Sequence, residues 1–211
     1  MGSDIWYVVR FWAVLFLVGS AAFPLTRLLF SKWFDRGYLF SKSVGLVVVT
    51  WVVYALGTVR VLPFSLASII LGLVVVFCGG LLFSAISDRR PAFAKAMAGR
   101  QAISNATKTS RSSHIASRIL LIAFEELFFF VALLFWSWIK GHEPSIRGLE
   151  KFMDFGFTQS ILTHPYFPTP DMWYAGHTIN YYYFGHIALA ILTKLSGIDL
   201  AITFNLILAT L

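Results

Sequence analysis

Long apolar blocks are the feature that most constrains how this chain can fold. Five of them cover residues 5–25, 38–59, 62–86, 116–139 and 181–197. A helix needs about 20 apolar residues to cross a hydrocarbon core about 30 Å thick, and backbone groups in lipid must bond within their own segment. A sixth block begins near Ile198 and is still apolar at Leu211. The sequence therefore predicts an all-α, polytopic membrane helix bundle with five full transmembrane helices and the start of a sixth.

Composition excludes an ordinary soluble domain and argues against a nucleic-acid partner. Only 13% of the residues are charged and 58% are hydrophobic, whereas soluble domains carry about 25% charged residues. The net charge of +7 is concentrated in segment 88–118. That segment has one aromatic residue, Phe93, and lacks the interleaved aromatics that single-stranded nucleic acid requires. We expect the lipid bilayer to be the partner, because basic residues bind anionic headgroups.

The distribution of lysine and arginine predicts an orientation. Loops 26–42 and 88–118 together hold eleven of these residues, whereas the turn at Arg60 and segment 140–183 hold four. Basic loops stay on the cytoplasmic side. We expect a multi-pass plasma-membrane protein whose N-terminus and segment 140–183 lie outside. We expect three parts: N-terminal helices over 1–139, an outer loop over 140–183, and the start of further helices over 184–211. We expect the chain to be the N-terminal part of a longer protein.

Glu125, Glu126 and Arg10 are charged residues inside the predicted helices. Glu125 and Glu126 are adjacent, so they point about 100° apart and occupy different environments. Arg118 lies two turns before Glu125 on the same face and is the simplest partner. Arg10 differs in depth from the glutamates by about 12 Å along the helix axis, too far for contact. Such residues either form a buried pair that holds helices together or line a substrate path.

Segment 140–183 carries most of the candidate chemistry. A short helix is predicted after Pro144, with Glu150 and Asp154 four residues apart on one face. Paired carboxylates beside a water-restricted interface suit general base catalysis on a hydroxyl acceptor, with Asp154, Glu150 and Asp171 as the catalytic candidates. Carboxylates and histidines can also bind a divalent metal ion, which is an alternative use of these residues. However, the histidine spacings match no metal motif, and no metal ligands are assigned. The histidines are His142, His164, His177 and His186.

A run of three tyrosines closes this segment. Asn180 precedes it and is predicted to be the N-cap of the next helix, which leaves backbone N–H groups free for an anion near Asp154. The candidate substrate-binding residues could stack on sugar rings, or they could belong to the aromatic belt at headgroup level. These candidates are Asn180, Tyr181, Tyr182, Tyr183, His186 and Trp173.

Three motifs carry a family resemblance. They read EKFMDF over 150–155, YFPTPDMW over 166–173 and AGHTINYYYFGH over 175–186. Together they resemble a bacterial and archaeal membrane-protein family named for its YYY motif, from about Glu126 to Leu211. The chain departs from the family pattern at Phe152 and Met172, where proline is usual, and at His177, where glycine is usual.

That family is similar in arrangement to the GT-C glycosyltransferases, which use polyprenyl-phosphate sugars and place a catalytic aspartate in the first outer loop. The resemblance implies that Asp154 is the general base, that Glu150 or Asp171 supports it or holds a metal, and that the tyrosines and His186 lie near the donor phosphate.

The leading functional hypothesis is a glycosyltransferase-like enzyme on the outer face that takes a polyprenyl-phosphate sugar donor. One alternative is a transporter or flippase-like protein, in which Glu125, Glu126 and Arg10 line a path. Another is a non-catalytic membrane scaffold. The enzyme requires Asp154 at the water interface, and the transporter requires the intramembrane charges to share a cavity.

Overall fold

The computed structural model describes residues 2–97, 108–148 and 150–210. Within these residues the chain forms helices and no strand, so the all-α prediction is confirmed; an isolated bridge pairs Pro170 with Thr178. The helices are α1 (Gly2–Leu29), α2 (Tyr38–Thr58), α3 (Leu66–Met97), α4 (Lys108–Gly141), α5 (Lys151–Thr163), α6 (Phe184–Ser196) and α7 (Leu200–Thr210).

Four helices in the described part of the chain are long and apolar enough to cross a membrane. These spans are Asp4–Leu29, Tyr38–Thr58, Leu66–Ser87 and Ala116–Gly141, and they coincide with the first four predicted blocks. The predicted fifth full helix is replaced by α6 and α7, which are bent by 118° to one another. With 13 residues, α6 is about 20 Å long. The prediction of five full spans is therefore not confirmed, because the structure has a fifth span only if α6 and α7 together are treated as one broken span.

Local sequence explains the bend between α6 and α7. Gly197 ends α6 in the left-handed conformation, at φ 60°, which glycine adopts without steric cost. Asp199 then starts α7, where its Oδ1 accepts the N–H of Ala201 at 2.8 Å. Arg10 of α1 donates to the carbonyl of Ser196 at this break. The predicted start of a sixth helix is thus a separate short helix that turns back after α6.

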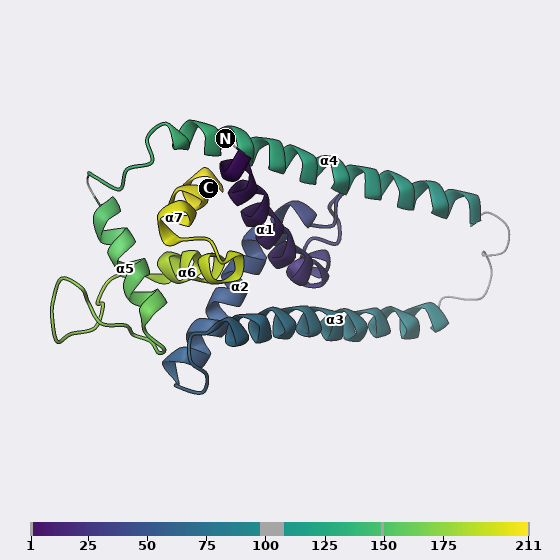
Figure 1. Cartoon of the computed structure of the whole chain (residues 1–211). Coiled ribbons are helices and arrows are strands. Elements are labelled where there is room, and N and C mark those ends of the chain that lie inside the picture. Colours follow the sequence, from purple (N-terminus) through teal and green to yellow (C-terminus); the bar gives the residue numbers. More distant parts are fainter. Residues whose placement is uncertain (1, 98–107, 149, 211) are drawn as a thin grey trace.

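The helix α1 lies at the centre of the bundle (Figure 1), in contact with α2 and α3. Its side chains Phe11 and Val18 are fully buried. Glycine allows the neighbouring helices to approach closely. A Cβ on Gly45 of α2 would lie 2.7 Å from the carbonyl oxygen of Val18, and one on Gly80 of α3 would lie 2.9 Å from the amide nitrogen of Leu25.

The predicted basic loops are shorter than expected because the flanking helices continue into them. Loop 26–42 is reduced by α1, which continues to Leu29, and by α2, which begins at Tyr38. Lys42 therefore lies inside a span. Similarly, α3 continues to Met97 and α4 begins at Lys108, whereas the central part of loop 88–118, residues 98–107, lies outside the described residues.

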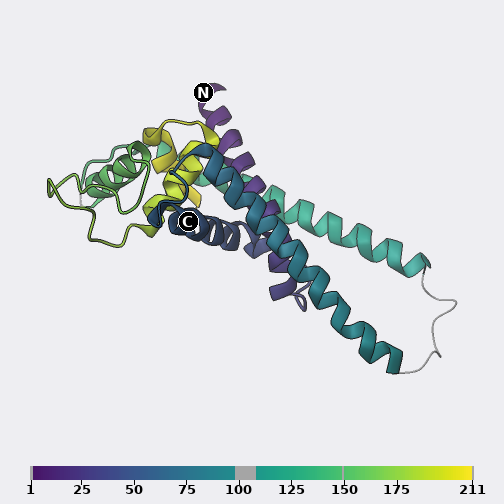
Figure 2. The same ribbon diagram turned by 90° about the horizontal axis from the view of Figure 1, so that it is seen from below.

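Segment 140–183 is an ordered cap on one end of the bundle, as its prolines predict. Figures 1 and 2 show α5 and its loop opposite the far ends of α3 and α4. The helix begins at Lys151 rather than directly after Pro144. Phe167 is buried against Gly57 of α2, where an added Cβ would lie 2.6 Å from its ring. Phe64 donates its N–H to the carbonyl of Pro165 at 2.6 Å.

Candidate functional site

Asp154 and His186 form the central pair of the candidate site. Nε2 of His186 lies 3.1 Å from Oδ1 of Asp154. A carboxylate can only accept, so the imidazole N–H donates. The Asp154 side chain is 35% exposed, whereas the His186 side chain is 13% exposed. Solvent therefore reaches the carboxylate while the imidazole is held in place.

Helix geometry brings this pair together. Asp154 lies in the first turn of α5, where the helix dipole favours a negative charge, and its N–H donates to Glu150 at 2.9 Å. His186 lies in the first turn of α6 and packs edge-on against Phe157 of α5 at 5.8 Å. The Nδ1 atom of His186 is buried and has no hydrogen-bond partner among the described residues. Contact between α5 and α6 thus fixes the ring with Nε2 toward Asp154.

Tyr181 and Tyr182 lie side by side, with ring centroids 3.9 Å apart, whereas Tyr183 packs elsewhere. Tyr181 donates its hydroxyl to that of Tyr182 at 2.5 Å, and Tyr182 is 74% exposed. The hydrogen bond to Tyr182, with desolvation and the nearby charges of Glu150 and Asp154, raises the pKa of Tyr181 to about 12. Tyr183 instead packs against Tyr54 of α2 at 6.2 Å. Tyr181 therefore remains a hydroxyl donor beside the acids, and Tyr183 anchors the loop.

Asp171 and Trp173 belong to a separate part of the loop. Oδ1 of Asp171 accepts the N–H of Trp173 at 2.7 Å and that of Tyr174 at 3.3 Å. This pattern is a local turn stabilised by a carboxylate. The Trp173 side chain is exposed and its ring packs against Phe152 at 5.6 Å. The Asp171 carboxylate is thus engaged by its own loop.

The predicted N-cap role of Asn180 is wrong. Helix α6 begins at Phe184, its N-cap is Tyr183, and no side chain caps it. Asn180 lies outside the helix and is exposed. Tyr183, which packs against Tyr54 of α2, has φ −118° and ψ 11°, so its backbone is not helical and α6 starts after it. Glu150 likewise precedes α5 without a side-chain cap bond.

The donor set does not fit a metal centre. Among the described residues, no group of three or more His, Cys, Asp or Glu residues gathers closely enough to hold a metal ion. Asp154 and His186 are together, whereas Asp171 is engaged elsewhere.

Glu126 is the centre of a second polar cluster, inside the helix bundle. Its carboxylate accepts from Nε1 of Trp12 at 2.7 Å, from the hydroxyl of Tyr38 at 2.5 Å and from Nζ of Lys42 at 2.5 Å. The side chains of Lys42 and Glu126 are each 12% exposed. One carboxylate therefore joins α1, α2 and α4.

Sequence reasoning missed the partners of Glu126. The count of basic residues assigns Lys42 to loop 26–42. However, Lys42 is also the lone lysine of block 38–59 and follows Tyr38 by four residues. This spacing puts both residues on one helical face. Arg118 is not the partner: no ion pair within 4.0 Å joins it to either glutamate in the described residues. Arg10 bonds to Ser196, consistent with its expected distance from the glutamates.

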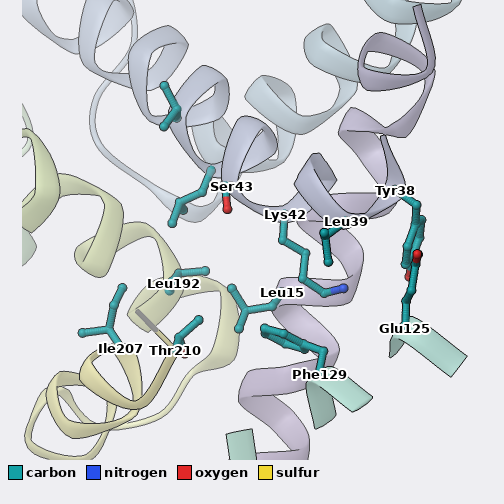
Figure 3. Close-up of a pocket in the computed structure, with 12 residues that line it drawn as sticks. Leu15, Tyr38, Leu39, Lys42, Ser43, Glu125, Phe129, Leu192, Ile207 and Thr210 are labelled. Carbon is teal, nitrogen blue, oxygen red and sulfur yellow. The ribbon is translucent and has the colours of Figure 1, made fainter. Parts of the chain in front are cut away.

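Glu125 differs from its neighbour. Its Oε2 is buried and has no partner among the described residues. It lines a cavity of about 240 Å³ together with Lys42. Figure 3 shows Lys42 extending toward the side where Tyr38 and Glu125 lie, with Leu192 on the other side. The structure thus brings Glu125 and Lys42 to one cavity and leaves Arg10 elsewhere.

Comparisons with known proteins give one match. Residues 48–211 match the model of the family described as "Uncharacterized membrane protein (DUF2298)". No curated protein and no solved structure matches the chain. The family match begins within α2 and includes both α5 and α6, and the described helices include four that can span a membrane. The chain is therefore an integral membrane protein and belongs to the DUF2298 family.

Proposed function

We propose that this membrane protein is a glycosyltransferase-like enzyme that uses a polyprenyl-phosphate-linked sugar, with Asp154 as its general base. The observation that carries the proposal is the Asp154–His186 pair, which joins the first turns of two helices at 3.1 Å while Asp154 stays 35% exposed. A base must be held in place and still reach the acceptor. The likeness of motifs 150–155 and 175–186 to the YYY-motif family, and through it to the GT-C enzymes, supports the same assignment.

The chemistry needs one proton acceptor and one leaving group. The acceptor hydroxyl attacks the anomeric carbon of the donor, and a new bond forms between its oxygen and that carbon. The bond from the anomeric carbon to the phosphate oxygen breaks, and the polyprenyl phosphate leaves with the electron pair. Asp154 takes the hydroxyl proton. His186 is a positioning residue, because its N–H bond to Oδ1 fixes the carboxylate.

Neighbouring groups support sugar binding. Tyr181 donates its hydroxyl proton to Tyr182, which leaves the hydroxyl of the exposed Tyr182 to donate to a phosphate or sugar oxygen. Trp173 and Tyr182 present exposed rings on the same loop, and such rings stack on sugars. Glu150 precedes Asp154 by one turn, and Asp171 shapes the turn that carries Trp173. No step is assigned to a metal.

The proposed reaction takes place on the outer face of the plasma membrane. Segment 140–183 has few basic residues, whereas the opposite end of the bundle carries Arg27, Lys32 and Arg36 in or beside the turn between α1 and α2. The basic end of a membrane protein stays in the cytoplasm.

The decisive experiment compares Asp154→Asn with Glu125→Gln in cells whose surface glycans are profiled. Loss of the general base should lower the glycan product by about 10²–10⁴-fold, at an unchanged amount of membrane-inserted protein. Glu125→Gln should leave the profile intact. An unchanged profile for Asp154→Asn at normal protein level would refute the transferase proposal.

Transport is a second candidate, and one observation favours it. Glu125 and Lys42 line the same cavity inside the bundle, and one oxygen of Glu125 lacks a partner in the part of the chain that the structure describes. Glu126 and Arg10, by contrast, are bonded to neighbouring helices, which favours a structural role for them. A transporter would lose substrate flux in Glu125→Gln and keep it in Asp154→Asn, the reverse of the transferase outcome.

A further inference from the structure

A second cavity, of about 560 Å³, opens between the N-terminal end of α1, the C-terminal end of α4 and the helix α7. Figure 1 shows these three elements next to one another. Its apolar wall is formed by Ile5, Val8, Leu134 and Leu206. Neither Asp154 nor any of the three adjacent tyrosines is among its lining residues, so it is distinct from the proposed catalytic pair.

Two buried oxygens in this cavity lack hydrogen-bond partners among the described residues: Oγ of Ser137 and Oδ1 of Asn205. The amide Nδ2 of Asn205 donates to the carbonyls of Pro144 at 3.1 Å and Ala201 at 2.9 Å. These two bonds fix the orientation of the amide and leave Oδ1 as a free acceptor. A buried acceptor without a donor is costly, so the site favours a ligand that brings hydroxyl groups.

Two lysines lie at the mouth of the same cavity, close to the carboxylate of Glu143. Lys140 lines the cavity and uses one of its three N–H groups on the carbonyl of Glu143, at 2.7 Å. Lys151 lies beside Lys140. A hydrogen bond from Ser145 chiefly lowers the pKa of Glu143, and the charges of Lys151 and Lys140 add to this effect. The two ammonium groups repel each other, Glu143 offsets part of their charge, and a bound anion would offset more of it.

Asp4 also lines the cavity, and its negative charge disfavours a ligand with several negative charges. A phosphodiester carries a single charge, so it suits this balance better than a free phosphate. Lys140 and Trp138 lie in the last turn of the span Ala116–Gly141. That is the level of lipid headgroups, where tryptophan and lysine are enriched.

We propose that the cavity between α1, α4 and α7 binds an anionic phospholipid whose headgroup carries hydroxyls, as in phosphatidylglycerol. Its phosphodiester lies at Lys140 beside Lys151, and its hydroxyls donate to Oδ1 of Asn205 and bond to Oγ of Ser137. The acyl chains run along the apolar wall. This proposal does not depend on a transferase activity. A polyprenyl-phosphate sugar offers the same chemistry, namely a phosphate and hydroxyls on an apolar chain, so the test separates these two sources.

The test uses the full chain in detergent and counts bound lipids by native mass spectrometry. Four ligands are titrated: phosphatidylglycerol, phosphatidylcholine, phosphatidylmethanol (an anionic phosphodiester without headgroup hydroxyls) and a polyprenyl-phosphate sugar. Lys140 and Lys151 each contribute about 1 kcal/mol, and Asp4 and Glu143 offset part of this sum, so we expect phosphatidylglycerol to bind about tenfold more tightly than phosphatidylcholine. Phosphatidylmethanol should fall between them. A preference for the polyprenyl-phosphate sugar over phosphatidylglycerol would overturn the phospholipid assignment.

Variants locate the site. Lys140→Gln should weaken phosphatidylglycerol binding about fivefold, and the control Lys32→Gln, at the other end of α1, should not. Ser137→Ala removes a hydroxyl that has no protein partner, so it should keep the fold and weaken phosphatidylglycerol but not phosphatidylmethanol. Ala201→Trp should fill the cavity and remove the bound lipid.

Equal binding of phosphatidylglycerol and phosphatidylcholine would refute the proposal, as would unchanged binding in Ala201→Trp. The Asp154→Asn variant should bind phosphatidylglycerol normally, so failure of the transferase proposal and failure of this one are distinguishable.

Discussion

Glu126 and Asp154 both accept hydrogen bonds from side-chain nitrogens, yet their surroundings differ. Glu126 receives three donors, from Trp12, Tyr38 and Lys42, and its side chain is 12% exposed. Asp154 receives one side-chain donor, from His186, and is 35% exposed. A carboxylate with three donors on its four lone-pair sites holds helices together, whereas one with a single donor keeps lone pairs free to accept a proton. The comparison teaches that the number of engaged lone pairs, more than burial alone, separates a structural acid from a candidate catalytic one.

The largest effect expected from this comparison is on stability at Glu126. Glu126→Leu leaves Lys42 charged and without its counter-ion inside the bundle, so the free energy of unfolding should fall by about 3–5 kcal/mol. Denaturant unfolding in detergent measures this change. Glu125→Leu is the matched control: one of its oxygens has no partner, so its cost should be small.

The double variant Glu126→Leu with Lys42→Leu sharpens the same point. Replacement of both charges by apolar side chains should recover most of the lost stability. If the double variant were as unstable as Glu126→Leu, the stabilisation by Glu126 would come from its hydrogen bonds with Trp12 and Tyr38 rather than from the ion pair with Lys42.

The next effect concerns Arg10, which bonds to the end of α6. Arg10→Met should lower the free energy of unfolding by about 1.5–3 kcal/mol, the range for hydrogen bonds to a charged group. Arg27→Met, at an exposed position of the same helix, provides the control in the same unfolding assay. Equal losses in both variants would contradict a specific role at the α6–α7 break.

His186 should matter for activity more than for stability. In His186→Phe the Asp154 carboxylate loses its N–H donor, and transfer should fall about tenfold, equivalent to about 1.4 kcal/mol. The loss should appear in kcat rather than in KM, because His186 positions the base and does not touch the donor. A large fall in melting temperature without a change in kcat would assign the pair to the structural class, together with Glu126.

The smallest effect is a titration. Because the pKa of Tyr181 is raised to about 12, above the ordinary value of 10, its contribution to stability is complete below pH 10 and is lost as the pH rises through 12. Ultraviolet difference titration against Tyr181→Phe measures that phenol. Tyr182→Phe removes the main cause of the shift, so it should bring the titration of Tyr181 back toward pH 10. An unchanged midpoint would show that the Tyr182 hydroxyl is not its partner.

Block length and proline placement were enough to predict four of the helices and an ordered segment 140–183. The break between α6 and α7 had a readable signal, a glycine followed two residues later by an aspartate, Gly197 and Asp199. The start of α6 had none, because it follows Tyr183, whose backbone is not helical and whose ring packs against Tyr54. The partners of Glu126 come from α1 and α2, and the sequence does not reveal which faces of these helices meet α4.

The close packing of the Phe167 ring on Gly57 couples the motions of two segments. An added Cβ at Gly57 would lie 2.6 Å from the Phe167 ring, and Phe64, just past the turn after α2, bonds to the neighbouring Pro165. The loop after α5 is therefore fastened to the end of α2 at two points a few residues apart. Any displacement of α2 along its axis would carry this loop with it, and with the loop the turn that presents Trp173. The contact between Gly57 and Phe167 would thus transmit a movement of α2 to the exposed ring of Trp173.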